Sequence, residues 1–193
     1  MIKLNLQNKT LQTLQQLFGD RFCDFLGFTL NLETGTISDK LNSNSIRDTN
    51  EKHIQIFAAL LCNYAFANPT PLSGKLVKFK DIPGGYAYEG AFVQRTIQPI
   101  AEVFGEKPEM LLKAARLLGG LRRNLGDSSV EINALKGIPL TYILWKADEF
   151  PASANILYDK SAGNYLPNED RAVLGELTTS HLIDAKKPLN FEE

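Results

Sequence analysis

The sequence contains few of the side chains that ligate soft metals, with only two cysteines and two histidines among 193 residues. Two thiols cannot hold a Cys₄ iron–sulfur cluster, and neither cysteine has the spacing typical of structural zinc. Cys23 and Cys62 both lie within apolar patterns that predict helices. We therefore expect two buried free thiols in a reducing cytoplasm. His53 and His181 are too far apart in the chain to predict a metal site or a catalytic triad.

An excess of charge of either sign is also missing, because the formal net charge is −1. Without a basic surface field we do not expect nucleic acid as a partner. No apolar run is long enough to span a membrane, and the first residues lack the basic-then-apolar pattern of a signal peptide. The apolar share of 44% and the charged share of 22% are typical of globular proteins. A cytoplasmic protein without membrane segments is predicted.

Motifs for nucleophilic serines and for nucleotide phosphates are absent from the sequence. There is no GxSxG and no SxxK. Gly119 and Gly120 followed by Arg122 and Arg123 resemble an anion cradle, but the segment lacks the Lys-Ser/Thr ending of a P-loop. We interpret it as the end of a helix.

Helical periodicity is strongest in five segments. The spacing of Leu11, Phe18, Phe22 and Phe25 predicts an amphipathic helix over residues 9–26. Asp48 and Glu51 have the form of a capping box, and the helix that follows carries apolar residues on two faces, which predicts a central position. The remaining helices are predicted at 92–103, where Pro99 interrupts the hydrogen bonding, at 109–118, and from Pro167 onward.

Strand patterns are concentrated in the second half of the chain. Residues 129–135, 140–145 and 154–158 predict consecutive strands, which pair most easily in antiparallel fashion. Residues 28–32 with the turn that follows predict a short hairpin, 42–50 a surface loop, and Lys75–Lys80 an edge strand. The predicted fold class is α+β, with an antiparallel sheet built largely from the C-terminal half and packed with N-terminal helices and the C-terminal helix. We expect one domain over residues 1–187 and a tail at 188–193.

Several blocks of sequence carry a family resemblance. They include IPGGYAYEGAFVQRTIQPIAEVFG from Ile82 and GIPLTYILWKADEFPASANILYDKSAGNYLPNEDRAVLGEL from Gly137. Over about Thr70 to Ile183 the chain resembles an uncharacterised family of anaerobic bacteria and archaea, domain of unknown function number 3786. The resemblance implies a setting in anaerobic or corrinoid metabolism, because some members are fused to an iron–sulfur domain of the corrinoid-protein type. This chain lacks the four cysteines of such a domain.

Carboxylates and one arginine are the candidate functional groups. Asp148 and Glu149 lie in a turn and Asp159 ends the following strand, so these acids could share a catalytic or metal site. Adjacent residues of a strand point to opposite faces, so only one acid of the Asp148–Glu149 pair could face a given site. The alternative interpretation is a solvent-exposed turn whose acids favour solubility. Arg95 could form a bidentate pair with the carboxylate of a ligand or with Asp148.

Aromatic residues with a polar end concentrate in the same region, which favours a ligand cleft or an interface. We predict a cleft between the sheet and the Gly84–Arg95 segment, lined by Tyr86, Tyr88, Arg95, Trp145, Asp148 and Glu149.

Three functions are compatible with these patterns. The first is a binding or accessory protein for a small anionic or tetrapyrrole/corrinoid-type ligand, with an iron–sulfur or corrinoid protein as a possible partner. The second is an enzyme with a carboxylate-based, metal-dependent site. The third is a protein-interaction module that docks through the Lys75–Lys80 edge strand. The sequence identifies neither a cofactor nor a catalytic residue.

Overall fold

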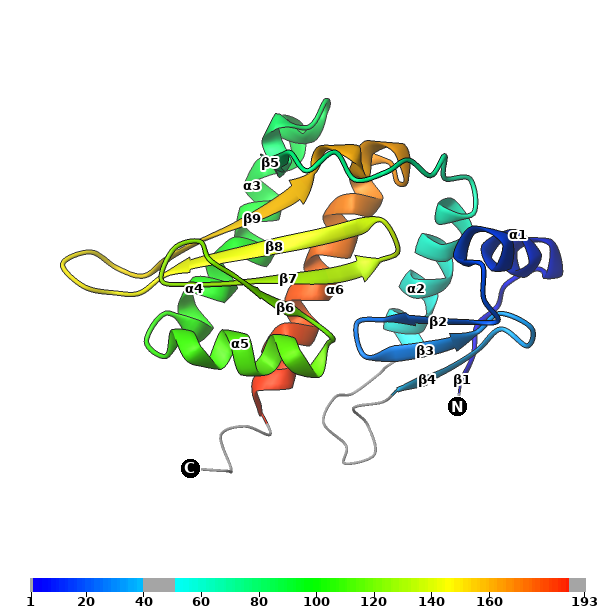
Figure 1. Cartoon of the computed structure of the whole chain (residues 1–193), viewed down its shortest axis with the longest axis horizontal. Coiled ribbons are helices and arrows are strands. Elements are labelled where there is room, and N and C mark those ends of the chain that lie inside the picture. The colour runs from blue at the N-terminus through cyan, green and yellow to red at the C-terminus, as the bar shows by residue number, and fades with distance from the viewer. Residues whose placement is uncertain (1, 40–50, 188–193) are drawn as a thin grey trace.

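The computed structural model describes residues 2–39 and 51–187, and it has two antiparallel sheets packed with helices. The larger sheet comes from the C-terminal half, so the predicted α+β class is confirmed. The predicted loop at 42–50, the Asp48 cap and the tail at 188–193 lie outside the described residues. Figure 1 shows the smaller sheet with helices α1 (Asn8–Phe18) and α2 (Glu51–Tyr64) at one end of the molecule and the larger sheet at the other.

The larger sheet has the strand order β5-β9-β8-β7-β6, and every neighbouring pair is antiparallel. The three predicted strands are confirmed, and the Lys75–Lys80 segment supplies the predicted edge strand. The sequence did not predict β6, a short strand whose residues are all exposed and therefore carry no apolar alternation. The bounds are β5 Leu76–Lys78, β6 Leu121–Arg123, β7 Ser128–Leu135, β8 Ile138–Trp145 and β9 Ser153–Asp159.

The smaller sheet corrects the predicted first helix. Helix α1 ends at Phe18, because Gly19 adopts a left-handed conformation with φ of 68°. Phe22 and Phe25 lie instead in a strand that pairs with the predicted hairpin. The order is β1-β4-β3-β2, and the bounds are β1 Ile2–Lys3, α1 Asn8–Phe18, β2 Phe22–Phe25, β3 Phe28–Asn31 and β4 Thr36–Asp39.

Helices cover one face of the larger sheet. Figure 1 shows α3, α4 and α6 behind it, and α5 also packs on β7. Helix α6 is the central helix, with buried residues over most of its length. Helix α2 buries one face through Phe57, Leu60, Leu61 and Tyr64, so the prediction of a central helix there was wrong. The bounds are α2 Glu51–Tyr64, α3 Glu89–Phe92, α4 Gln98–Phe104, α5 Pro108–Leu117 and α6 Asn168–Lys186.

A π-helical segment, Val93–Ile97, joins α3 to α4. Pro99 has no N–H to donate to the carbonyl of Arg95, and the wider π turn accommodates this because the N–H of Gln98 donates to the carbonyl of Val93. The hydroxyl of Thr96 donates to the carbonyl of Phe92 at 2.6 Å. The predicted interruption at Pro99 therefore takes the form of a π segment, a feature frequent at functional sites.

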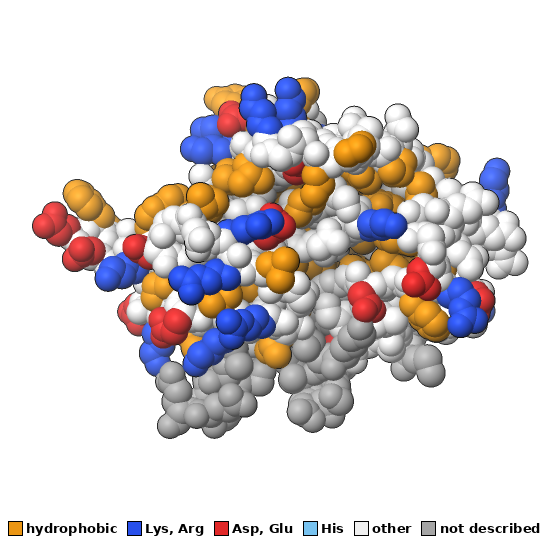
Figure 2. Space-filling model, in the orientation of Figure 1, with side chains coloured by type: hydrophobic (Ala, Val, Ile, Leu, Met, Phe, Trp, Pro, Cys, Tyr) orange, Lys and Arg blue, Asp and Glu red, His pale blue; other side chains and the backbone are white. Residues whose placement is uncertain are grey.

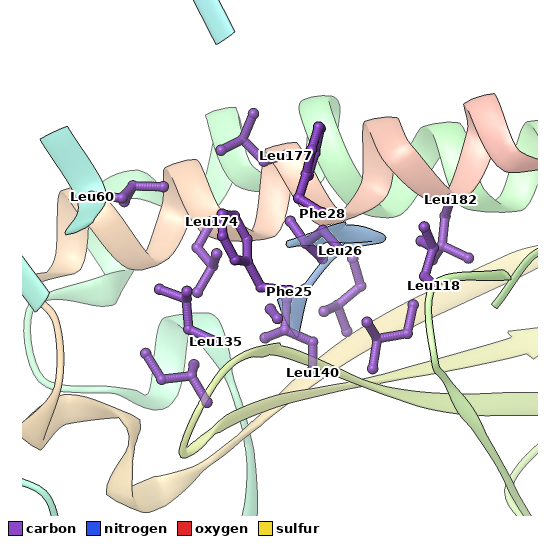
Figure 3. Close-up of a cluster of buried hydrophobic side chains, with 14 of the residues drawn as sticks. Phe25, Leu26, Phe28, Leu60, Leu118, Leu135, Leu140, Leu174, Leu177 and Leu182 are labelled. Carbon is purple, nitrogen blue, oxygen red and sulfur yellow. The ribbon is translucent and has the colours of Figure 1, made fainter. Parts of the chain in front are cut away.

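One contiguous hydrophobic cluster joins the two sheets. The turn between β2 and β3 reaches into it, and Figure 3 shows Phe25, Leu26 and Phe28 lying between α6 and the larger sheet. Leu26 takes a positive φ of 50°, which is strained for a leucine, and its side chain is fully buried there. Burial of this leucine, worth roughly 2 kcal/mol, offsets the strain.

Among the described residues, none of the helices combines the length and the apolar character that crossing a membrane requires.

Candidate functional site

A cleft that contains two of the predicted site residues lies between α6 and the segment formed by α3 and the π helix. Its volume is about 210 Å³. Phe92 forms a buried wall and stacks on Phe79 at 4.3 Å between ring centroids. The lining residues are Tyr88, Ala91, Phe92, Arg95, Thr96, Glu169, Ala172, Val173 and Glu176.

Two polar contacts bridge the cleft from opposite walls. The hydroxyl of Tyr88 donates a hydrogen bond to the carboxylate of Glu169. This hydrogen bond raises the pKa of Tyr88, because the protonated phenol is the form that can donate. The guanidinium of Arg95 lies 3.5 Å from Glu176, and the two side chains are 63% and 48% exposed. The cleft therefore has apolar walls, one arginine (Arg95) and two acids, Glu169 and Glu176, each of which contacts a residue of the opposite wall.

The π segment determines how Arg95 enters the cleft. The extra residue in this turn shifts the positions that follow it around the helix, so Arg95 and Thr96 line the cleft together with Phe92 and Ala91. Sequence reasoning missed the opposite wall. Glu169, Ala172, Val173 and Glu176 have the i, i+3, i+4 and i+7 spacing of one helix face, which was the available signal.

The predicted site residues are divided between two separate surfaces of the described structure. Tyr88 and Arg95 share the cleft, whereas Trp145 and Asp148 line a shallow basin on the β8–β9 hairpin. Tyr86 is 81% exposed and lines neither of them. Glu149 is exposed on the same hairpin. Figure 1 shows that this hairpin projects beyond the sheet, away from α3 and α6.

The structure separates Asp148 and Glu149 from Asp159, the three acids that could have shared a site. The two acids of the turn precede the start of β9, and Asp159 ends this strand of seven residues, so about 20 Å of extended chain separates them. Asp159 is 3% exposed and accepts hydrogen bonds from Ser73, Gly74 and Ser161. The Asp159 carboxylate therefore has a structural role, because both of its oxygens accept hydrogen bonds from the chain.

Other predicted residues have structural contacts. Gly119 takes a φ of 76° just after α5 ends, in agreement with the helix-end interpretation. Arg123 forms an ion pair with Glu131 at 2.6 Å. Arg122 and Arg123 line a pocket of about 510 Å³ together with Glu109 and Asp127. Within the described part of the chain, no group of three His, Cys, Asp or Glu residues is arranged to hold a metal ion.

Comparison with known proteins identifies one family. The family model for "Domain of unknown function (DUF3786)" matches residues 27–181, which is most of the chain. The matched region includes both walls of the cleft and the β8–β9 hairpin. No curated protein and no solved structure is similar enough to give a match.

Proposed function

We propose that this chain, which belongs to the DUF3786 family, is a binding protein that holds a small carboxylate-bearing ligand in the cleft between α3 and α6. The observation that carries the proposal is Arg95, held by a π-helical segment at the rim of an apolar cleft. Clefts with apolar walls and a few oriented polar groups are typical of ligand sites.

The ion pair of Arg95 with Glu176 leaves the arginine available to a ligand. Both side chains are about half exposed and the contact is long at 3.5 Å, so the pair contributes about 0–1 kcal/mol. A ligand carboxylate that forms a bidentate pair with the guanidinium gains more than this. Glu176 would then turn to a donor group on the ligand. An amine or hydroxyl would suit it, and a small zwitterion with an apolar body matches the cleft best.

The size of the cleft limits how each ligand considered from the sequence could bind. The cleft volume of about 210 Å³ is below the usual range of drug-sized pockets, about 300–1,000 Å³. A corrin or porphyrin ring is larger than this cleft, so a tetrapyrrole would insert only a peripheral carboxylate side chain. The corrinoid setting implied by the family resemblance therefore supplies one class of ligand to test, and small aliphatic zwitterions supply the other.

A carboxylate-based enzyme has weaker support. Asp159 is committed to hydrogen bonds with the chain, and Asp148 and Glu149 are exposed on a projecting hairpin. The acids of the cleft, Glu169 and Glu176, each contact a partner on the opposite wall.

Thermal stabilisation by ligands tests the proposal. The purified protein is heated with cobalamin, a porphyrin, aliphatic carboxylates and aliphatic amino acids, each over a concentration series. A ligand at 100 times its Kd stabilises the folded state by about 2.7 kcal/mol, or about 5–10 °C in Tm. Arg95→Gln removes the cation and should abolish the shift in Tm. Ala91→Trp fills the cleft from its rim and should abolish the shift as well. Arg116→Gln, an exposed arginine on α5, should retain it. A shift that survives Ala91→Trp, or no shift with any of these compounds, contradicts the proposal.

A further inference from the structure

The connection between β8 and β9 projects from the body of the protein. Residues 146–151 are all exposed, and Phe150 is 78% exposed. Figure 1 shows this loop reaching past the other elements at one side of the molecule. In Figure 2, hydrophobic and acidic side chains lie together at its end. A large aromatic side chain at the end of a projection contributes nothing to the core of the protein that carries it.

The base of the hairpin is held in place by specific contacts. Asp127 accepts a hydrogen bond from the N–H of Lys146 at 2.8 Å and donates its own N–H to the carbonyl of Leu144 at 2.9 Å. On the other side, a Cβ placed on Gly105 would lie 2.3 Å from the Cβ of Ala152. The returning chain therefore packs directly against the glycine that ends α4.

The end of the hairpin has internal order as well. The N–H of Asp148 donates to the carbonyl of Phe150 at 3.0 Å, which closes a tight turn. Trp145, 41% exposed, and Pro151 extend the apolar surface from Phe150 back to the strand. An aromatic residue on a preorganised element loses little conformational entropy when it binds, which is how interface hot spots gain affinity.

Charge indicates what the hairpin contacts. Asp148 and Glu149 directly precede Phe150, and neither forms an ion pair with another described residue. Lys146, at the base of the loop, is the one cation among the exposed residues 146–151, so the loop is net negative and its two acids lie next to Phe150. This charge disfavours an anionic membrane surface and favours lysine or arginine on the opposing surface. We propose that the β8–β9 hairpin is a docking element, and that Phe150 inserts into an apolar socket bordered by lysine or arginine on a partner protein.

Photocrosslinking tests this proposal in cells of the source organism. A benzophenone-bearing phenylalanine replaces Phe150 in the full chain, and a second version carries it at Phe66, which is 89% exposed but has no acid within three residues. The expected result is an adduct from position 150 alone, mapped to a partner surface with lysine or arginine beside the attached residue. The double substitution Asp148→Lys and Glu149→Lys should abolish this adduct.

Binding to the purified partner supplies the second measurement. Phe150→Ala should weaken binding about thirtyfold or more, the loss expected of a hot-spot residue, whereas Phe66→Ala should change it less than threefold. The Tm of Phe150→Ala should equal that of the wild type because the side chain is exposed. Adducts with lipid or with a second copy of this chain, the same adducts from both positions, or no adduct from position 150 would each overturn the proposal.

Discussion

Asp159 accepts two hydrogen bonds from Ser73, one from its backbone N–H at 3.0 Å and one from its hydroxyl at 2.8 Å, across 86 residues of sequence. The same carboxylate accepts the N–H of Gly74 and both donors of Ser161. These bonds join the end of β9 to the loop that leads into β5. The edge strand of the larger sheet is therefore positioned by one buried acid.

Replacing this acid should destabilise the protein. In Asp159→Asn the charge is lost and one acceptor oxygen becomes a donor that faces other donors. We expect a loss of about 2–3 kcal/mol in the free energy of unfolding, measured by urea denaturation. Asp148→Asn is the matched control and should change stability by less than about 0.5 kcal/mol, because Asp148 is exposed. Equal stability of the two variants would contradict the structural role of Asp159.

The same carboxylate should make stability depend on pH. Burial raises the pKa of Asp159, but the hydrogen bonds from Ser161 and Ser73 lower it by more, to about 2. In the unfolded chain the pKa is about 3.9, so protons bind the unfolded state more readily. This contribution of about 2 kcal/mol is complete above about pH 4 and is lost as the pH falls to about 2. The difference in unfolding free energy between wild type and Asp159→Asn should therefore shrink over this interval, and a constant difference would refute the assignment.

Two helical glycines should respond oppositely to alanine. A Cβ at Gly175 would lie 2.7 Å from the hydroxyl oxygen of Tyr158 and 2.8 Å from the ring of Phe92, whereas a Cβ at Gly90 meets nothing within 4 Å. Gly175→Ala should cost about 1–3 kcal/mol through overpacking. Gly90→Ala should be neutral or stabilise by up to about 1 kcal/mol, because alanine lowers the entropy of the unfolded chain. Thermal unfolding of both variants decides the matter, and destabilisation by Gly90→Ala alone would contradict the packing described.

Lys136 connects the turn between β7 and β8 to the end of α1. Its Nζ donates to the carbonyl of Phe18 at 2.8 Å. The last carbonyl groups of a helix have no N–H donor within the helix, so this bond satisfies one of them. Lys136→Met retains most of the aliphatic chain and removes the donor, so we expect a loss of about 1 kcal/mol in unfolding free energy. Lys113→Met on the exposed face of α5 serves as the control and should have no measurable effect. Equal effects of the two substitutions would exclude a capping role.

The two cysteines should differ in reactivity. Burial, reinforced by the negative charge of Asp24, raises the pKa of Cys23 to about 12, so its thiol stays protonated at neutral pH. Cys62 is only half buried. A thiol reagent at pH 8 should modify one cysteine in the folded protein and two after denaturation. Mass spectrometry should locate the first modification at Cys62, and modification of Cys23 at the same rate would show that the β2 region opens readily.

Local patterns identified most of the secondary structure because their causes are local. Apolar alternation and flanking turn residues predicted β7, β8 and β9, and the start of α6 after Pro167 was predicted from proline and the acids that follow. The first helix was overextended because Phe22 and Phe25 fit the spacing of a helix as well as that of a strand. Gly19 ends the helix through its left-handed conformation, and the residues that follow form β2, which pairs with β3.

The candidate site was predicted only in part, for a geometric reason. Tyr88 and Arg95 are seven residues apart, about two helical turns, so their location on the same side of this helical segment follows from local structure. Whether Trp145 and Asp148 join them depends on the direction in which the β8–β9 hairpin leaves the sheet. Glu169 and Glu176 come from the other end of the fold, and only the packing of α6 against α3 places them opposite Arg95.

The amino-acid sequence by itself determined the fold class, the antiparallel order of the main strands and the break in the helix at Pro99. Those features depend on periodicity, turn chemistry and a missing N–H, all of which act within a few residues. Tertiary structure alone decided that Arg95 faces α6 and that the Asp159 carboxylate accepts hydrogen bonds from the chain. It also decided that Phe150 lies at the end of the projecting β8–β9 hairpin. These placements arise from packing between segments far apart in the chain, where the direction of one element depends on the shape of all its neighbours.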